Sequence, residues 1–371
     1  HSRNPQEIRQ IMSATKVIQV KGVDPYDITI GRALLGEVGK ALGSGVKKVL
    51  VIHPVGLTAS AELLKSTLDD QGYEAILAGV PDSEDAKRVE VAAFCWGVLG
   101  QADFTRSDAV IGFGGGSTTD LAGFVAATWL RGVKLIQVPT TLLAMVDAAI
   151  GGKTGINTAE GKNLVGCFYA PSAVIIDLDT LESLPQNEIL AGFGEVVKYG
   201  FIADERILEL IEEDVAVATD SKSDVFAELI ERSVAIKARV VGEDFKEAGL
   251  REILNYGHTL GHAIELAERY KWRHGAAISI GMVFVAELAR LAGRLSDEAV
   301  DRHRSVLKLI GLPTEYKAEK WDQLVATMQR DKKSRAGTLR FVVLDAVGKP
   351  TIMAAPAPEL LHAAFQEIVA G

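Results

Sequence analysis

Short runs of β-branched and aliphatic residues alternate with helical patterns along the first half of the chain, and this alternation restricts the fold strongly. Strands are predicted at residues 49–53, 75–80, 109–113 and 135–138. Helical periodicity falls between them, at residues 59–68, 89–99 and 119–130. Strands connected by helices run parallel, because each crossover returns the chain in the same direction. The first half is therefore predicted to be an α/β domain with a parallel sheet.

The second half changes character after the strand-like run Val174-Ile-Ile-Asp177. Apolar residues then recur at helical spacing, in segments at 188–200, 225–241, 253–269, 276–291 and 297–310. A late pair of strands is predicted at 339–344 and 351–354. We expect an α/β domain at residues 13–180 and a mostly α-helical domain at residues 181–371. Residues 1–12 are taken as an N-terminal extension outside the fold.

Composition excludes several classes of protein. Of 371 residues, 48% are hydrophobic and 24% are charged, which is typical of a globular enzyme. The two cysteines, Cys95 and Cys167, indicate no disulfide framework and favour the cytoplasm. No uncharged apolar run reaches the ~18 residues of a membrane span. The net charge of −9 argues against nucleic acid as a partner.

Three of the seven histidines lie close together near residue 260. His258 and His262 are one helical turn apart and would share a face, and His274 follows twelve residues later. Imidazoles grouped in this way bind a divalent metal or an anionic substrate. Spacing alone would select both helical histidines, His258 and His262, as ligands. The alternative is that each one caps a helix or pairs with an acid.

A glycine-rich segment, Gly114-Gly-Gly-Ser-Thr-Thr-Asp120, connects a predicted strand to a predicted helix. Glycines at such a junction let a pyrophosphate approach the backbone at a helix N-terminus, which favours anions. The segment is not a G-x-G-x-x-G fingerprint, so a purely structural turn is the alternative. Lysines beside glycines, as at Lys153 and Lys162, indicate a small anionic ligand, although lysines in solvated loops are the usual case.

Taken together, the motifs resemble those of the 3-dehydroquinate synthase family from about residue 15 to the C-terminus. The matching segments include Gly114 to Asp120, Pro139-Thr-Thr141, Gly151-Gly-Lys153-Thr-Gly-Ile-Asn157, Gly194-Glu195-Val-Val-Lys198, Arg251 to His262 and His274-Gly275. The resemblance implies an N-terminal NAD-binding α/β domain, a helical C-terminal domain and a homodimer. It also implies bound NAD and a divalent metal, usually zinc, with cobalt as the other option.

The resemblance assigns the metal ligands to Glu195, His258 and His274, which revises the spacing argument, and makes His262 a substrate contact. It assigns the phosphate to Lys153, Asn163, Asn255, His262, one of Lys332 and Lys333, and Arg131 from the partner subunit. Lys237 and Arg251 would bind a carboxylate, since a guanidinium fits that group in a bidentate manner. Asp147 and Lys198 would contact the C4 and C5 hydroxyls of the substrate.

For the cofactor, the resemblance places the pyrophosphate at Gly114, Gly115 and Gly116 near Asp120. Thr140 and Thr141 would contact the adenosine, Glu84 and Lys87 the ribose region, with Lys162 and Ser183 as further contacts. The chain departs from the family where an early strand ends in His53-Pro54, because many members have an acid there that binds the adenosine ribose. Adenosine recognition is therefore an open point.

The implied reaction converts 3-deoxy-D-arabino-heptulosonate 7-phosphate to 3-dehydroquinate and phosphate, a step of the shikimate pathway to chorismate and the aromatic amino acids. It proceeds by transient oxidation with NAD, phosphate elimination, re-reduction and an intramolecular aldol closure. The alternatives are another sugar phosphate cyclase, a metal-dependent polyol or glycerol phosphate dehydrogenase, and a non-catalytic nucleotide-binding relative. The anionic sugar phosphate is the expected partner, with neither nucleic acid nor a membrane.

Overall fold

The computed structural model describes residues 15–334 and 337–371, without the side chains of residues 332–334. The predicted extension at residues 1–12 and the side chains of Lys332 and Lys333 therefore lie outside the described residues. The chain divides into two compact units, which we describe separately. Unit 1 comprises His1–Leu184 with Lys237–Lys246, and unit 2 comprises Pro185–Ile236 with Glu247–Gly371.

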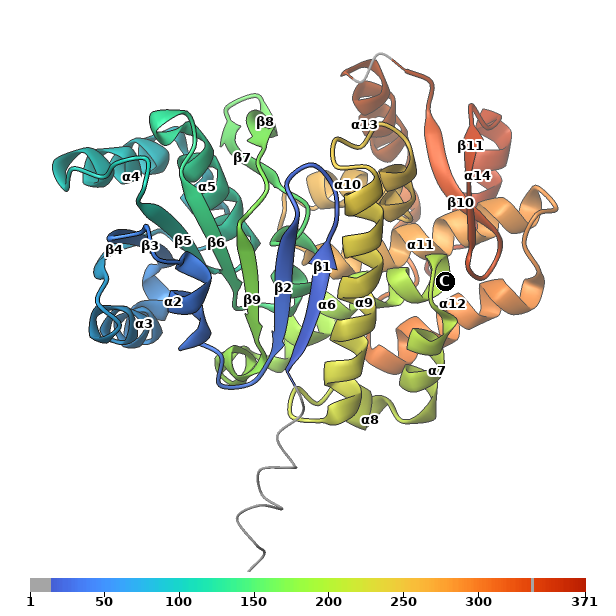
Figure 1. The fold of residues 1–371 in the computed structure, drawn as a ribbon. Coiled ribbons are helices and arrows are strands. Elements are labelled where there is room, and N and C mark those ends of the chain that lie inside the picture. The colour runs from blue at the N-terminus through green and yellow to red at the C-terminus, as the bar shows by residue number, and fades with distance from the viewer. Residues whose placement is uncertain (1–14, 335–336) are drawn as a thin grey trace, which may run out of the picture. The chain divides into compact units, whose positions relative to one another are not determined.

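Unit 1 is built on a seven-stranded sheet in the order β1-β2-β9-β6-β5-β3-β4 (Figure 1). Its strands are β1 (Lys16–Val20), β2 (Tyr26–Gly31), β3 (Lys48–Pro54), β4 (Glu74–Val80), β5 (Ala109–Gly114), β6 (Lys134–Pro139) and β9 (Ala173–Asp177). Every pairing is parallel except that of β1 with β2. The expected parallel sheet is confirmed. The edge pair β1 and β2 was not predicted.

Helices cover both faces of this sheet because its strands are apolar on both sides. The helices are α2 (Glu37–Leu42), α3 (Thr58–Asp70), α4 (Val89–Gln101) and α5 (Gly116–Thr128). In β3, Leu50 and Ile52 pack with α4 and α5, whereas Val49 and Val51 pack with α2 and α3. The chain thus leaves the neighbouring strands β3 and β5 toward opposite faces. In such sheets, ligands bind at the carboxyl ends of two neighbouring strands whose helical connections leave toward opposite faces.

Most of the remaining elements of unit 1 follow the carboxyl ends of strands, whereas η3 lies between the end of α5 and the amino end of β6. A two-stranded hairpin, β7 (Lys153–Thr158) and β8 (Gly161–Phe168), packs on α5. Short helices are η1 (Val55–Leu57), η2 (Ser83–Lys87), η3 (Trp129–Arg131), the π-helix η4 (Ala144–Ala148) and η5 (Leu178–Ser183). A π-helix is rare and is frequent at functional sites.

Unit 2 is mostly helical, as expected. Its elements are α6 (Gln186–Ile202), α7 (Glu205–Glu213), α8 (Val215–Ala218), α9 (Asp224–Glu243, whose last turns belong to unit 1), η6 (Leu250–Asn255), α10 (His258–Ala267), α11 (His274–Leu291), α12 (Asp297–Ile310), η7 (Ala318–Lys320), α13 (Trp321–Ser334), β10 (Arg340–Ala346), β11 (Lys349–Ala354) and α14 (Pro358–Gln366). The late hairpin is confirmed as β10 and β11.

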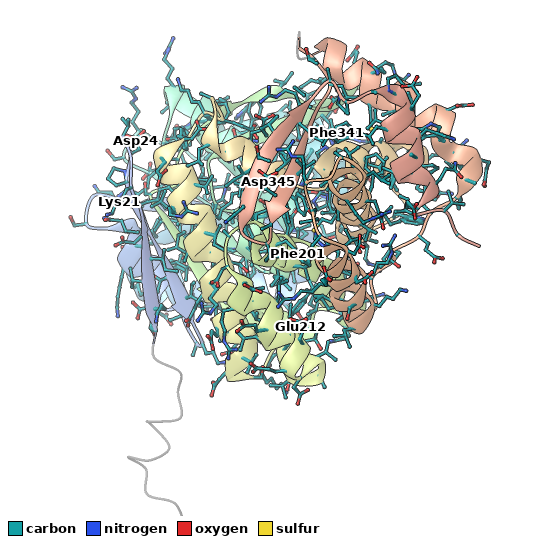
Figure 2. The ribbon with its side chains drawn as sticks, turned by 90° about the vertical axis from the view of Figure 1, so that its right-hand side faces the viewer. Lys21, Asp24, Phe201, Glu212, Phe341 and Asp345 are labelled. Carbon is teal, nitrogen blue, oxygen red and sulfur yellow. The ribbon has the colours of Figure 1, made fainter. Side chains whose placement is uncertain are left out.

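The core of unit 2 surrounds α11, which contacts α6, α10, α12, α14 and β10. Of the described helices, α11 alone is long and apolar enough to cross a membrane, but 78% of it is buried within the protein. Its composition is therefore explained by packing, with about 1.5–3 kcal/mol gained for each aliphatic side chain fully buried. Phe341 of β10 packs on Phe284 of α11, and Gly348 of the hairpin turn donates to the carbonyl of Phe201 in α6 (Figure 2).

Candidate metal and dinucleotide sites

A left-handed glycine determines where α10 begins. Gly257 has φ 78°, and a Cβ atom there would lie 2.7 Å from Cγ of Met282. The chain therefore turns at Gly257, and His258 becomes the first residue of α10. The predicted helix at 253–269 is wrong in its first turn, because residues up to Asn255 form the 3₁₀ helix η6.

Glycines also let α6 and α11 approach until their backbones touch. A Cβ atom on Gly275 would lie 1.6 Å from the carbonyl oxygen of Ala191, and one on Gly194 would lie 2.7 Å from Cα of Gly275. Glu195 and His274 are the chain neighbours of these two glycines. The close crossing consequently brings their side chains together.

The donor atoms of Glu195, His258 and His274 meet at one point of unit 2. Oε1 of Glu195 lies 2.8 Å from Nε2 of His274 and 3.1 Å from Nε2 of His258, and the three donors lie within 4.8 Å of one another. Ligands of a tetrahedral zinc ion, each at about 2.0–2.2 Å, lie about 3.3 Å apart. The observed separations are close to this value.

The burial of Glu195 is a second observation that bears on metal binding. Its side chain is fully buried, and Oε2 has no hydrogen-bond partner of good geometry among the described residues, although the Lys198 ammonium forms an ion pair with it. Buried charges are normally paired or bind metals. Two imidazoles and one carboxylate suit a divalent transition metal and leave a fourth position for a substrate oxygen. The residues therefore fit the predicted metal.

The distal nitrogens of both rings are hydrogen-bonded. Nδ1 of His258 donates to the carbonyl of Tyr256 at 3.0 Å, and Nδ1 of His274 donates to Oε1 of Glu265 at 3.1 Å. Such partners hold each ring so that Nε2 can bind a metal. Sequence reasoning missed Glu265, although its position seven residues after His258 places it on the same face of α10.

The electrostatics of the cluster favour a cation. Burial opposes ionisation of Glu195, but Lys198 and His258 hold its pKa well below the usual value. Burial also opposes the charge on His274, but hydrogen bonds to Glu195 and Glu265 raise its pKa to about 10. A divalent ion would therefore compete with the proton that Glu195 and Glu265 stabilise on His274.

In unit 1, the glycine segment lies at the carboxyl end of β5 and begins α5. Gly115 is the N-cap residue and provides no side-chain cap, so the first N–H groups of α5 are open to an anion. Gly114 allows close packing, because a Cβ atom there would lie 2.7 Å from Oγ1 of Thr118. The amide of Thr140 donates to the carbonyl of Gly114 at 2.9 Å, and Thr141 is the neighbour of Gly115.

Polar residues predicted to contact the cofactor form a network beside this helix. The Lys87 ammonium lies 2.8 Å from Oδ2 of Asp120 and also donates to Oδ1 of Asn163. Burial raises the pKa of Asp120, while the charge of Lys87 opposes this shift. Glu84 accepts from Asn157 at 2.7 Å and lies 3.6 Å from Nζ of Lys162. A hydrogen bond thus connects Asn163, which is predicted to contact the substrate phosphate, with Lys87, which is predicted to contact the ribose of the cofactor.

The π-helix η4 carries Asp147, which pairs with the buried Lys237 of α9 within unit 1. Lys153 is exposed at the start of β7. Leu130 and Arg131 of η3 both have positive φ, of 48° and 66°, a conformation that costs free energy in residues other than glycine. His53 is buried, and its Nδ1 donates to the carbonyl of Pro54.

The other predicted residues are less closely grouped. In unit 2, Arg251 is buried in η6, Asn255 donates to Glu247 at 3.1 Å, and His262 follows His258 by one turn with its ring centroid 5.2 Å away. Ser183 is exposed at the end of η5. The roles assigned to all these residues stay predictions.

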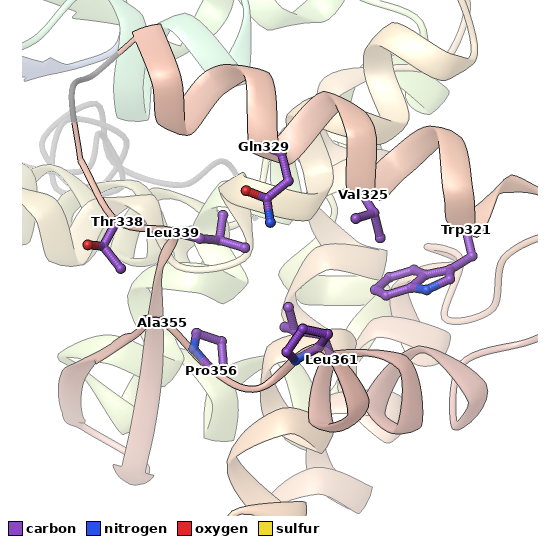
Figure 3. A pocket seen from close by; sticks show the side chains of 9 residues that line it. Trp321, Val325, Gln329, Thr338, Leu339, Ala355, Pro356 and Leu361 are labelled. Carbon is purple, nitrogen blue, oxygen red and sulfur yellow. The ribbon is translucent and has the colours of Figure 1, made fainter.

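A separate pocket of about 320 Å³ lies in unit 2 among α13, α14 and β10. Trp321, Val325, Leu339 and Leu361 make its lining mainly apolar (Figure 3). No predicted site residue whose side chain the structure describes is among its lining residues.

The two units define a class of protein that combines an α/β unit, built on a mostly parallel sheet, with a mostly helical unit carrying a carboxylate and two imidazoles whose donor atoms meet. Family models match residues 77–191 as 3-dehydroquinate synthase N-terminal and residues 192–334 as 3-dehydroquinate synthase C-terminal. The chain belongs to the 3-dehydroquinate synthase family.

The sequences of curated relatives match almost the whole of this chain. The 3-dehydroquinate synthase of Leifsonia xyli subsp. xyli is 65% identical over 354 residues, which cover 95% of this chain and 98% of the relative. The 3-dehydroquinate synthase of Streptomyces avermitilis is 59% identical over 347 residues, covering 94% and 96%.

Solved structures with the same fold include two synthases that contain NAD+ and a divalent metal. A 2-deoxy-scyllo-inosose synthase complexed with carbaglucose-6-phosphate, NAD+ and Co2+ superposes with a TM-score of 0.85 at 27% identity, covering 95% of this chain and all of the other. A 2-epi-5-epi-valiolone synthase from Streptomyces hygroscopicus subsp. jinggangensis with NAD+ and Zn2+ bound gives 0.85 at 25% identity, covering 95% and 99%. A probable glycerol dehydrogenase from Sinorhizobium meliloti, at 16% identity and a TM-score of 0.64, shares the fold alone.

Proposed function

We propose that this protein is a 3-dehydroquinate synthase, a phosphate lyase that converts 3-deoxy-D-arabino-heptulosonate 7-phosphate to 3-dehydroquinate and phosphate. The observation that carries the proposal is the meeting of Glu195, His258 and His274 in a chain that is 65% identical to a protein of that name. The reaction belongs to the shikimate pathway, and the scarcity of cysteine suits a cytoplasmic enzyme.

The bound groups would supply two kinds of chemistry. A divalent metal such as zinc would lower the pKa of a coordinated oxygen and stabilise its negative charge, and NAD would accept and return a hydride within one turnover. Glu195, His258 and His274 would hold the metal. The first turn of α5 would bind the pyrophosphate of NAD, with Glu84, Lys87, Asp120, Thr140, Thr141, Lys162 and Ser183 as further contacts.

The cationic residues would bind the two anionic ends of the substrate. Lys237 and Arg251 are both buried, so their charge-assisted bonds to a carboxylate would be strong. The phosphate would be held by Lys153, Asn163, Asn255, His262 and one of Lys332 and Lys333. Asp147 and Lys198 would orient the hydroxyls. These contacts explain why a chain of net charge −9 concentrates lysine and arginine at these positions.

We also propose that the protein is a homodimer in which Arg131 completes the phosphate site of the partner subunit. The exposed apolar side chains of β8, Leu164, Val165 and Phe168, support a contact between copies. The strained backbone at Leu130 and Arg131 supports a functional role for that turn.

The experiment is to incubate the metal-loaded protein with the heptulosonate phosphate and a catalytic amount of NAD. We expect release of one phosphate per 3-dehydroquinate formed, without accumulation of NADH. Parallel reactions contain NAD in excess, with the heptulosonate phosphate or with glycerol or polyol phosphates as substrate, because a dehydrogenase consumes one NAD for each molecule that it oxidises. Steady production of NADH from any of them, with no phosphate released, would replace the proposal by the dehydrogenase alternative.

A further inference from the structure

The chain contains an acidic residue beside the metal ligands for which the proposed reaction has no role. Glu265 lies in the last turn of α10, three residues before the helix C-cap Glu268, and its side chain is 14% exposed. We propose that Glu265 is a positioning residue that orients His274 for metal binding. This inference deepens the proposed function and rests on it, because it takes His274 to be a metal ligand.

The spacing of α10 places Glu265 where it can act on His274. His258, His262 and Glu265 stand at positions i, i+4 and i+7, so they share one face of the helix. His274 is the first residue of α11, and its ring centroid lies 5.4 Å from that of His258 and 6.0 Å from that of His262. Glu265 therefore meets the edge of the His274 ring that faces away from Glu195.

The hydrogen bonds of His274 have a definite direction. Nε2 faces Oε1 of Glu195 at 2.8 Å, and Nδ1 faces Oε1 of Glu265 at 3.1 Å. With the proton on Nδ1, the ring donates to Glu265, and the lone pair of Nε2 points to the position where the metal would bind. Glu265 thus selects both the orientation and the tautomer of the ligand.

The two imidazole ligands are held by different groups. The distal nitrogen of His258 donates to a backbone carbonyl, that of Tyr256, whereas the distal nitrogen of His274 donates to a carboxylate. A hydrogen bond to a charged acceptor is stronger and gives the ring more electron density. His274 is consequently the ligand whose strength depends on a replaceable side chain.

A second cation held by His262, Glu265 and His274 is the competing interpretation, because their donor atoms also lie within 4.8 Å of one another. It is disfavoured by the tautomer, since an Nδ1 that carries the proton has no lone pair for a metal. His262 is also half exposed, and its Nε2 lies 4.0 Å from Oε2 of Glu265. We therefore expect one metal ion per chain.

The test compares Glu265→Ala and Glu265→Gln with the unchanged protein. Zinc affinity is measured by competition with a chromophoric chelator, and the cobalt-substituted forms are compared by their visible d–d spectra. Removal of such an outer partner typically weakens metal binding about 10–100-fold, which we expect for Glu265→Ala. Glu265→Gln retains an acceptor oxygen and should recover part of the affinity and of the cobalt spectrum.

A matched control is Glu268→Gln, which removes a carboxylate close by in the chain that instead binds Tyr316 and Lys317. It should leave zinc affinity and the cobalt spectrum unchanged. Thermal unfolding of the metal-free forms verifies folding, and Glu265→Gln carries the test if the alanine variant does not fold.

The results separate this inference from the proposed function. Wild-type zinc affinity and cobalt spectrum in both Glu265 variants, or two zinc ions bound per unchanged chain, would overturn the positioning role. Weakened zinc binding in Glu265→Ala alongside a protein that releases no phosphate from the heptulosonate would support the positioning role while contradicting the synthase assignment.

Discussion

At the scale of single residues, the two nitrogens of a histidine ring have separate tasks in unit 2. His258 and His274 each bond a neighbour through Nδ1, so that Nε2 faces Glu195. His303 has both nitrogens occupied: Nδ1 donates to the carbonyl of Ala299, and Nε2 accepts from the hydroxyl of Tyr256. The first two rings are therefore suited to bind a metal, whereas the third is a structural core residue.

Replacement of His258 tests the metal assignment. His258→Ala should lose bound metal and turnover while the protein stays folded, since the removed ring is a buried polar group at the first residue of α10 and not one of the apolar core side chains. Metal content, circular dichroism and phosphate release are the measurements. A variant that keeps full metal and full rate would remove His258 from the ligand set.

His303 should make stability depend on pH. Burial lowers its pKa to about 4, below the ordinary histidine value of 6.5. The unfolded chain therefore binds a proton that the folded chain does not, and stability present in full above pH 6.5 is lost as the pH falls toward 4. Between pH 7.5 and pH 5 this one group should cost about 2 kcal/mol.

The measurement is urea unfolding of the unchanged protein and of His303→Gln at both pH values. The variant keeps a donor and an acceptor at this position but does not titrate, so its loss of stability on acidification should be smaller by that amount. Equal losses in the two proteins would show that His303 does not contribute.

At the scale of elements, the site depends on how closely α6 and α11 cross. Gly275→Ala would place a Cβ atom 1.6 Å from the carbonyl of Ala191, so the helices must separate. We expect a loss of stability of about 1–3 kcal/mol or more, together with weaker zinc binding, because Glu195 and His274 move apart.

The control is Gly97→Ala in α4, where a Cβ atom would meet open space. A helical alanine there should leave zinc binding unchanged and stabilise the protein by up to about 1 kcal/mol. Equal zinc affinities for Gly275→Ala and Gly97→Ala would contradict the role of the crossing.

The elements that were predictable from the sequence are those with strong burial. Strands β3, β5 and β6 are buried along almost their whole length, and the edge strand β4 is apolar although only partly buried, so continuous apolar runs identify all four. The hairpin β7 and β8 was not predicted, because β8 is largely exposed and has little hydrophobic pattern. The start of α10 was misplaced because periodicity does not reveal the left-handed conformation of Gly257.

The metal site was partly predictable for a related reason. The spacing of His258 and His262 indicates a shared face, but only the contact between Gly194 and Gly275 determines that Glu195 meets His258 and His274. That contact joins residues 81 positions apart, so no local pattern could indicate it. Motif resemblance was needed to select Glu195.

At the scale of the whole molecule, the membership of residues 237–246 in unit 1 could not be read from the sequence. The helical pattern of α9 continues through Lys237, whereas that residue pairs with Asp147 of unit 1. The boundary between the two domains was predicted at residue 180, whereas the structure divides the two units after Leu184.

The proposed dimer makes a prediction about mixed subunits. Arg131→Ala and His258→Ala should each be inactive, but co-refolded together they should recover about one quarter of the activity, because half of randomly paired dimers carry one complete site. Each variant refolded alone is the control. No recovery in dimers shown to be mixed would mean that Arg131 serves its own subunit.

The most direct test of the metal centre is anomalous diffraction at the zinc edge from crystals of the zinc-loaded protein. We predict a single anomalous peak, which marks a zinc ion bonded to Oε1 or Oε2 of Glu195 and to Nε2 of His258 and His274. A zinc ion bonded to His262 and Glu265 instead, or at any position where Glu195 is not a ligand, would contradict the account.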